Sequence, residues 1–447
     1  MRGLRSTVAL LALLIGLGAY VYFVASKTDN TTTLEKLFEG IDAATIAELK
    51  VKSSSGDVTT LKKEGSTWKI LTPVAMAAAA TDATGIANVL ASLDIVRVVE
   101  EVPTDLTEYG LNAPKIEIDF KSTDGKASGR LLVGEVTATG GNLYARRDDQ
   151  KRVVLIGQHH ESSLNKSTFD LRDKTVVKFD RSAVDGLEVT LAGKALAQLA
   201  KSGSEWRMTK PFSARADSLV VDGLIGQIES LQMISPGTSA PTADDLKKFG
   251  LDAPRATFSL HLGSARATLT IGTNPNNSTV YVRESSRPDV FAADISITDE
   301  TRKVLDDYRK KEPFDFRTFS VNHIEVTRGG QTVVIDRVKA ADANSPDTWR
   351  RVSPTPGDPD REKVEKFLSA VADTRITSFV DARAKTGLES PAAVVMAKFD
   401  EGTKEERVTF GKNGVDVFVS RSDDYGAGKI DAQKFDEAMK ALDEISK

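Results

Sequence analysis

Apolar residues recur with helical spacing at three places along the chain. The three sets are Ile86, Val89, Leu90 and Leu93; Val221, Leu224, Ile225 and Ile228; and Val364, Phe367, Leu368 and Val371. Each set lies 4, 7, 8 and 11 residues after an aspartate, which is Asp82, Asp217 or Asp360. This spacing places four apolar side chains on one face of an α-helix, and the aspartate can cap the helix N-terminus. The pattern predicts three amphipathic helices with aspartate caps.

Short runs of alternating apolar and polar residues surround each of these helices and predict β-strands. Around the first helix the runs are "AELKVKS", "TTLKKEG", "TWKILTP", "KIEIDFKS", "GRLLVGE", "NLYARRD" and "RVVLIG". Strand runs that follow one another directly favour antiparallel pairing over a parallel, doubly wound sheet. We therefore expect an α+β fold with antiparallel β-meanders and two or three helices around each amphipathic set.

Other residues repeat with the same period. Each tryptophan is followed five positions later by a proline, at Pro73, Pro211 and Pro354. The further marks are the tryptophans Trp68, Trp206 and Trp349, the glycines Gly110, Gly250 and Gly387, and the prolines Pro114, Pro254 and Pro391. The glycines are 140 and 137 residues apart. Agreement of so many marks predicts three tandem copies of one unit of about 140 residues.

We expect the three homologous units at residues 34–175, 176–316 and 317–447, behind an anchor at residues 1–26 and a polar linker at residues 27–33. The stretches "FDLRDK" at Phe169–Lys174 and "FDFRTF" at Phe314–Phe319 mark the joints between units. If so, each joint carries an aspartate with an arginine two positions later.

The glycine mark lies in the similar stretches "EYGLNAP", "KFGLDAP" and "KTGLESP". Gly110 can adopt the left-handed conformation that ends a helix, and Leu111 can then pack back on the last turn. Pro114 favours an extended chain after it. We interpret the motif as a helix stop followed by a strand start, and not as a glycine-rich ligand loop.

The N-terminal segment has the composition of a membrane anchor. Residues 7–25 are 19 positions without a charge, preceded by Arg2 and Arg5. A helix of this length crosses a bilayer core of about 30 Å. The arginines favour a cytoplasmic N-terminus. A cleaved signal peptide is the alternative interpretation. Both interpretations export the rest of the chain, so we expect a single-pass protein of the cytoplasmic (inner) membrane with its bulk in the periplasm.

The combination of Trp, Pro, capped helix, "YGL..P", "VG" and "Y.R", closing at "FDLRDK", resembles the bacterial domain-of-unknown-function family DUF4340. The resemblance covers essentially everything after the anchor. It implies a single-pass exported protein that is an accessory of an ABC transport system related to the one named for gliding motility. The third copy departs from the pattern, with Thr386 and Phe418 replacing aromatic marks and Ser420 replacing the arginine.

Tyr144 and Arg146 in the first copy match Tyr281 and Arg283 in the second. Residues two apart on a strand share one face, so each pair could bind a sugar, a lipid headgroup or a carboxylate of a partner. The alternative, which we favour, is a half-buried strand covered by the arginine stem.

Two aspartate–arginine pairs, Asp170 with Arg172 and Asp315 with Arg317, could be recognition sites. We favour salt bridges that fix the joints between copies. The histidines are His159, His160, His261 and His323, and none has the spacing of a metal site.

The stretch "DDYGAGKIDAQK", Asp423–Lys434, has the glycine of a calcium loop but lacks oxygen ligands at Tyr425, Ala427 and Lys434. We interpret it as a turn and a strand before a last helix at Ala432–Ser446. That helix carries Phe435, Met439 and Leu442 at the spacing of core residues.

Composition limits the possible functions. The 60 basic and 64 acidic residues give a net charge of -4, which provides no field to attract nucleic acid. The absence of cysteine excludes disulfides, thiolate zinc sites and cysteine nucleophiles. No nucleophile elbow, phosphate loop or dinucleotide fingerprint is present.

We therefore expect a non-enzymatic membrane-anchored scaffold with no cofactor and no metal. Its expected partners are the membrane, through residues 7–25, and the subunits of an ABC transporter. The alternative is an extracytoplasmic binding module for an envelope glycan or lipid that uses the tyrosine–arginine strands.

Overall fold

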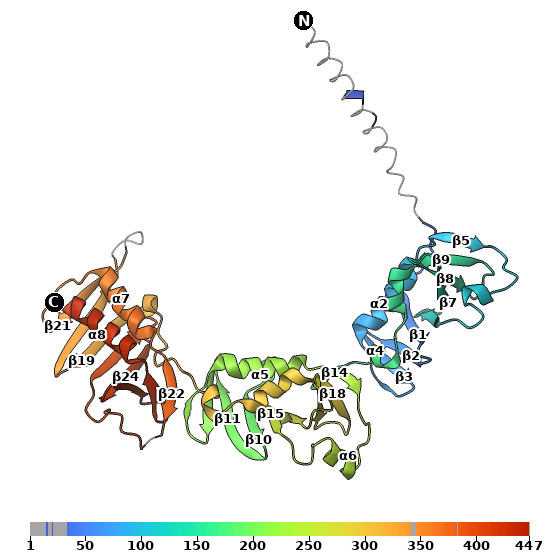
Figure 1. Cartoon of the computed structure of the whole chain (residues 1–447). Helices are drawn as coiled ribbons and strands as arrows, with labels where there is room; N and C mark the ends of the chain where they lie inside the picture. The colour runs from blue at the N-terminus through green and yellow to red at the C-terminus, as the bar shows by residue number, and fades with distance from the viewer. Residues whose placement is uncertain (1–14, 17–19, 21–33, 341–345, 382, 447) are drawn as a thin grey trace, which may run out of the picture. The chain divides into compact units, whose positions relative to one another are not determined.

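The structure, a computed structural model, describes residues 15–16, 20, 34–340, 346–381 and 383–446. It contains three large antiparallel sheets of nine, nine and eight strands (Figure 1). The chain divides into two compact units, Met1–Lys174 and Thr175–Lys447. The first unit holds the first sheet, and the second unit holds the other two.

The first sheet has the strand order β4-β3-β2-β1-β6-β7-β8-β9-β5. Its strands are β1 (Ile46–Lys52), β2 (Val58–Glu64), β3 (Thr67–Thr72), β4 (Met76–Ala77), β5 (Arg97–Glu100), β6 (Ile116–Ser122), β7 (Ser128–Val136), β8 (Asn142–Arg147) and β9 (Val153–Gly157). Its helical segments are η1 (Ala43–Thr45), α2 (Ala80–Ser92), η2 (Thr107–Tyr109), η3 (Gln158–His160), α3 (Glu161–Leu164) and α4 (Thr168–Leu171). Two four-stranded meanders thus join through β1 and β6, and α2 connects β4 at one edge to β5 at the other.

The second sheet repeats this order as β13-β12-β11-β10-β15-β16-β17-β18-β14. Its strands are β10 (Gly186–Leu191), β11 (Lys194–Ser202), β12 (Glu205–Lys210), β13 (Ala214–Arg215), β14 (Met233–Pro236), β15 (Ala256–Leu262), β16 (Ala265–Ile271), β17 (Thr279–Glu284) and β18 (Val290–Asp294). Its helical segments are η4 (Arg181–Ala183), α5 (Ser218–Ser230), α6 (Ala243–Lys248), η5 (Ile295–Arg302) and η6 (Leu305–Tyr308).

The third sheet has the order β21-β20-β19-β23-β24-β25-β26-β22. Its strands are β19 (Val321–Arg328), β20 (Gln331–Val338), β21 (Thr348–Ser353), β22 (Ile376–Val380), β23 (Ala393–Phe399), β24 (Lys404–Asn413), β25 (Asp416–Arg421) and β26 (Ala427–Ile430). Its helical segments are η7 (Thr318–Ser320), α7 (Arg361–Ala372) and α8 (Ala432–Ser446). The predicted last helix is α8, and its Phe435, Met439 and Leu442 are buried as the spacing predicts.

The predicted fold class is corrected on two points. First, the described chain is mostly antiparallel sheet with few helices, and not the predicted α+β fold, because the strands of each repeat join into one sheet of eight or nine strands. Second, no helix in the described part of the chain is long and apolar enough to cross a membrane. Residues 7–25 lie almost entirely outside the described residues, so the predicted transmembrane helix gains no support.

The helix caps follow the prediction in two of the three repeats. Asp217 accepts hydrogen bonds from the Leu219 and Val220 amides at 3.0 and 3.2 Å. Asp360 accepts one from the Lys363 amide at 3.2 Å. Helices α5 and α7 bury the two predicted apolar sets, Val221, Leu224, Ile225 and Ile228, and Val364, Phe367, Leu368 and Val371.

The cap predicted in the first repeat is wrong by three residues. Helix α2 begins after Ala79, which has no side-chain cap, and it buries Ala83, Ile86, Ala87 and Leu90. Asp82 lies in the first turn and pairs with Lys166 at 2.8 Å. Of the predicted apolar set, Ile86, Leu90 and Leu93 are nevertheless fully buried and Val89 is partly buried, so the cap was misplaced and the core face was not.

The tryptophan mark ties the sheet to the long helix. The Trp68 indole Nε1 donates to Thr84 Oγ1 at 3.3 Å, and the Trp206 indole donates to Asp222 Oδ1 at 3.0 Å. In both cases the acceptor lies 16 residues later. Because the contact is the same in both repeats, Ala79 occupies the position in the first repeat that Asp217 occupies in the second. The contact also explains why the distance in sequence between the tryptophan and the helix is kept.

The two glycine marks of each repeat pack against each other. Gly110 has φ +66°, and a β-carbon at Gly134 on β7 would collide with the carbonyl oxygen of Tyr109. Gly250 with Gly272 and Gly387 with Gly411 repeat this contact. The predicted helix stop holds in the first two repeats, after η2 and α6, but no helix precedes Gly387 in the described part of the third.

Candidate functional site

The predicted tyrosine–arginine strands are half-buried packing surfaces. The Tyr144 ring lies 5.0 Å from the Tyr109 ring, and the Tyr281 ring lies 4.4 Å from the Phe249 ring. Each strand aromatic therefore covers the aromatic residue that precedes the helix-stop glycine. In the third repeat Thr386 replaces the aromatic residue before the glycine, and Phe418 replaces the tyrosine of the strand.

The arginines of these strands are half-buried as well. Arg146 lies 3.6 Å from Asp148, and the Nε atoms of Arg146 and Arg283 are buried without a hydrogen-bond partner among the described residues. Tyr144 and Arg146 lie on β8 of the first unit, whereas Tyr281 and Arg283 lie on β17 of the second. These contacts are those expected of the half-buried strand that we favoured.

At the first joint, Asp170 contributes to a helix cap. Asp170 accepts from the Ser167 amide and hydroxyl at 3.0 and 2.7 Å, which caps α4, and it lies 3.7 Å from Lys174. Asp307 plays the same part before Arg309, where it accepts from the Val304 amide at 2.8 Å. The counterpart of "FDLRDK" is therefore "DDYRKK", Asp306–Lys311, and not "FDFRTF".

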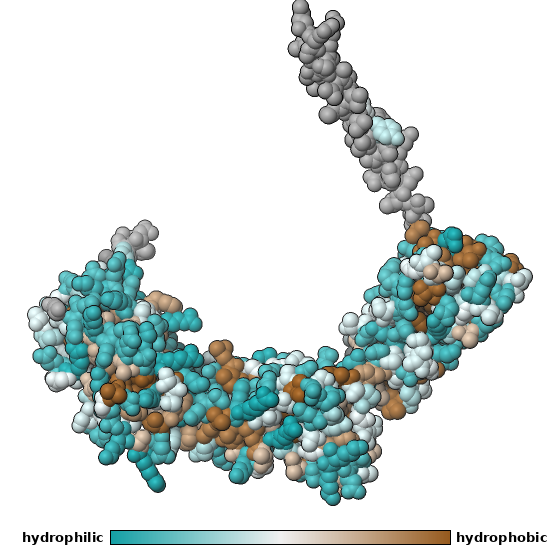
Figure 2. All heavy atoms as spheres, in the orientation of Figure 1, coloured by the Kyte–Doolittle hydropathy of each residue, from teal (hydrophilic) through white to brown (hydrophobic). Residues whose placement is uncertain are grey.

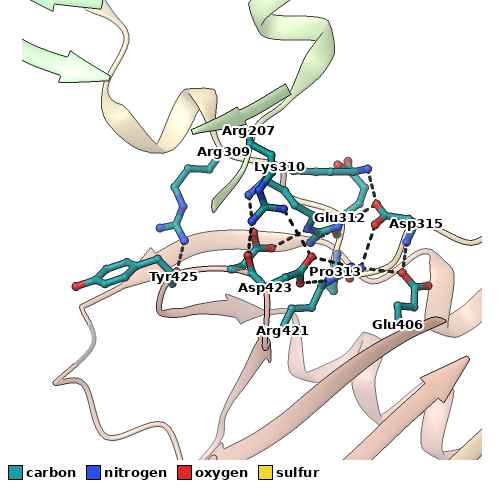
Figure 3. Close-up of polar contacts among 12 residues, drawn as sticks. Arg207, Arg309, Lys310, Glu312, Pro313, Asp315, Glu406, Arg421, Asp423 and Tyr425 are labelled. Atoms are coloured by element: carbon teal, nitrogen blue, oxygen red, sulfur yellow. Dashed lines mark hydrogen bonds and ion pairs between the residues drawn. The ribbon is translucent and has the colours of Figure 1, made fainter. Parts of the chain in front are cut away.

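Asp315 does lie at the joint of the second and third repeats, but Arg317 is not its partner. Its carboxylate accepts from Lys310 at 2.5 Å and from Arg421 at 3.1 Å (Figure 3). It also accepts from Arg215 at 2.9 Å. Arg215 comes from β13 of the second sheet and Arg421 from β25 of the third. One carboxylate therefore connects the two sheets.

Glu406 on β24 supports this centre from the third sheet. Its carboxylate accepts from Arg421 at 2.7 Å (Figure 3). It also accepts from the Asp315 and Phe316 amides at 2.9 and 3.2 Å. The Glu406 side chain is only 1% exposed. Arg421 also pairs with Asp423 through two hydrogen bonds of 2.9 and 3.2 Å.

Arg215 and Asp424 make the most direct contact between the sheets. The Arg215 amide and Nε donate to the two carboxylate oxygens of Asp424 at 2.5 and 2.8 Å. The Arg215 side chain is 6% exposed. We call Arg215, Lys310, Asp315, Glu406, Arg421, Asp423 and Asp424 the joint cluster.

An aromatic contact lies beside the joint cluster. The Phe212 ring, in the turn between β12 and β13, stacks on Tyr425 at 4.2 Å. The Arg309 guanidinium lies 3.5 Å from the centroid of the Phe379 ring and donates to the Tyr425 carbonyl at 2.5 Å. Charged and aromatic contacts thus fix the same two surfaces, which makes the second compact unit one body.

Burial and charge act in opposite directions on the carboxylates of the joint cluster. Burial alone would raise the pKa of Asp315, but Arg215, Lys310 and Arg421 outweigh it and hold that pKa below its ordinary value. Burial would likewise raise the pKa of Asp423, but Arg421 lowers it. Burial prevails at Glu406 and raises its pKa.

These directions predict the pH dependence of the second compact unit. The stabilisation from Asp315 and Asp423 is complete above their ordinary pKa of about 4 and is lost as the pH falls through their lower folded pKa. Glu406 has the opposite effect on stability. Its pKa is raised in the folded state, so its protonation as the pH falls removes a buried charge and stabilises the fold. We expect the free energy of unfolding to hold between about pH 7 and 5 and to fall steeply below about pH 4. Urea unfolding at a series of pH values measures this, and a steady loss between pH 7 and 5 would contradict it.

Sequence reasoning missed most of the joint cluster. One signal was available: Glu406 has the same parity on its strand as the buried Val408 and Phe410, so the alternation places it on the core side. Nothing similar indicates its partners. The residues 137 positions before Arg421, Asp423 and Asp424 are Glu284, Ser286 and Arg287, so the charges of this joint are not part of the repeat.

A cleft of about 730 Å³ opens beside the joint cluster. Glu205, Arg207 and Arg215 of the second sheet line one side of it. The other side is lined by η7 and by the hairpin between β23 and β24. Asp315, Glu406 and Arg421 also line it, so the joint cluster forms part of its wall.

The fold and the site define a class of protein: a tandem array of antiparallel-sheet domains in which two neighbours are fixed by buried charges. The chain belongs to the family described as domain of unknown function, DUF4340, which matches residues 68–207 and 206–391. Both matches begin at the tryptophan mark, so the first runs from β3 of one sheet to β12 of the next. Among curated proteins no significant match is found.

Proposed function

We propose that this protein is a non-enzymatic scaffold of an extracytoplasmic assembly at the membrane. The observation that carries the proposal is the joint cluster, in which side chains only 1 to 10% exposed, those of Glu406, Arg215 and Arg421, link two sheets. A scaffold must hold its contact surfaces at a fixed spacing, and a joint of this kind supplies that. A flexible linker would be sufficient for two independent binding domains.

The sequence supports the proposed location. Arg2 and Arg5 precede 19 uncharged positions at residues 7–25, a pattern of exported proteins. The expected partners are the ATPase and permease subunits of an ABC-type transporter, as the family resemblance implies. The surface suits protein contacts: Figure 2 shows separate hydrophobic patches on a largely hydrophilic face. Exposed large apolar residues include Leu219, Val304 and Phe319.

Affinity purification of the tagged, full-length protein from its own membranes in mild detergent tests this proposal. We expect near-stoichiometric recovery of transporter subunits, identified by mass spectrometry. Recovery should fall for Arg421→Ala, which breaks the joint cluster, and should persist for Lys398→Ala, which removes only an exposed ion pair of 3.7 Å. Recovery of the protein alone, with no membrane-complex subunit, would contradict a scaffold role.

A further inference from the structure

The cleft beside the joint cluster is bordered by a turn that differs from its two counterparts. In the first two repeats the 3-10 turn before the first strand is capped by an aspartate. Asp42 accepts from the Ala44 amide and Asp180 from the Ser182 amide, both at 2.9 Å. In the third repeat the cap position of η7 is Arg317, which makes no side-chain cap. A guanidinium has no acceptor, so this repeat lacks a stabilising contact that the other two have.

The replacing side chain has no other structural role among the described residues. Arg317 is exposed and lines the cleft, and its side chain makes no hydrogen bond or ion pair with the described part of the chain. Most other charged groups of the cleft wall are paired, including Lys404 with Asp400 at 3.0 Å. The cleft therefore presents a free guanidinium in place of a cap.

The same turn exposes a phenylalanine. Phe319 is 70% exposed and lines the cleft, whereas the equivalent positions of the first two turns are Ala44 and Ser182. An exposed phenylalanine ring forgoes the burial that usually stabilises it. Two departures from the repeat, at Arg317 and Phe319, thus face one cavity, and neither is explained by folding.

The hairpin beside η7, on the same side of the cleft, has an unusual backbone. Asp400 and Glu401, in the hairpin between β23 and β24, have φ of +50° and +60°, a conformation rare outside glycine. The Asp400 amide donates to the Ser320 carbonyl at 3.1 Å, which holds the hairpin against η7. Backbone strain of this kind gathers at binding sites.

We propose that this cleft binds an oligosaccharide that carries a carboxylate group. Arg317 provides a planar fork for the carboxylate, and Phe319 provides an apolar face for a sugar ring. The wall holds as many basic as acidic side chains, so it offers many partners for hydroxyl groups without attracting a highly charged ligand. A volume of about 730 Å³ accommodates a ligand of this size.

Isothermal titration calorimetry on the full-length protein in mild detergent tests the proposal. The probes are a tetrasaccharide of alternating glucuronic acid and N-acetylglucosamine, a disaccharide containing muramic acid, and the neutral N-acetylglucosamine tetramer. We expect at least one acidic probe to bind, and the neutral tetramer to bind at least tenfold more weakly. Absence of binding by both acidic probes at millimolar concentration would overturn the proposal.

Variants separate binding from folding. Arg317→Ala and Phe319→Ala should each lower the affinity for the acidic probe at least tenfold. Arg317→Asp restores the cap of the other repeats, so it should abolish binding without lowering the melting temperature. The matched controls are Arg407→Ala, an exposed arginine outside the cleft, and Val415→Ala, an apolar residue that is 88% exposed. Unchanged affinity in Arg317→Asp would overturn the assignment, as would tighter binding of a peptide containing glutamate and phenylalanine.

Discussion

Replacing Arg421 by alanine should lower the free energy of unfolding of the second compact unit by about 3–5 kcal/mol. The variant leaves the Glu406 carboxylate, 1% exposed, without the guanidinium that lies 2.7 Å from it. An uncompensated buried charge is far more costly than a lost surface pair. Urea unfolding in a Trp68→Phe background measures the effect, because the remaining Trp206 and Trp349 both lie in this unit.

A paired replacement separates the charge from the packing. Glu406→Gln together with Arg421→Met removes both charges and keeps an acceptor for the amides of Asp315 and Phe316, so it should recover part of the loss. Asp315 would still be paired with Arg215 and Lys310 in that variant. Lys398→Ala serves as a control, since its exposed pair with Glu405 should contribute less than about 1 kcal/mol. A loss below about 1 kcal/mol for Arg421→Ala would show that the joint does not depend on the joint cluster.

Gly134→Ala should destabilise the first compact unit by about 3 kcal/mol. The added β-carbon would collide with the Tyr109 carbonyl oxygen, and this neighbour is backbone that cannot rotate away. The helix-stop turn would have to move away from the sheet, and this movement would break the contact between the Tyr109 and Tyr144 rings. Thermal or urea unfolding followed at Trp68 measures the change.

Gly85→Ala is the matched control for Gly134→Ala. Gly85 lies in α2 of the same unit, and a β-carbon there would meet no atom within 4 Å. Because alanine favours helix over glycine, this variant should stabilise the unit by roughly 0.5–1 kcal/mol. Equal effects of the two substitutions would contradict the close contact between the glycine marks.

The repeat could be predicted from the sequence because each mark has a local role that any copy must satisfy. Trp206 donates to a helix residue 16 positions later, and Gly134 allows a turn to touch a strand. The prediction failed at Asp82 because the helix begins three residues earlier, after Ala79, whose side chain makes no cap. The fold class was wrong because strand patterns alone do not indicate how many strands join one sheet.

The candidate site was harder to predict, because its partners are distant in the chain. Arg215 and Asp424 are 209 residues apart, and no local pattern indicates which of many charges will meet. The tyrosine–arginine strands repeat in the sequence, and Tyr144 and Tyr281 make the same kind of aromatic contact in both copies. Residues that break the repeat, such as Arg317 and Phe319, are the better guide to a particular function.

The central claim is that the second and third sheets act as one rigid body, and a spin-label distance measurement tests it most directly. The chain has no cysteine, so Leu219→Cys and Val415→Cys, at positions 86% and 88% exposed, can be labelled uniquely in the two repeats. Double electron–electron resonance on this protein should give one narrow distance distribution, which broadens when Arg421→Ala is added. A broad distribution in the protein with an intact joint cluster would contradict the claim.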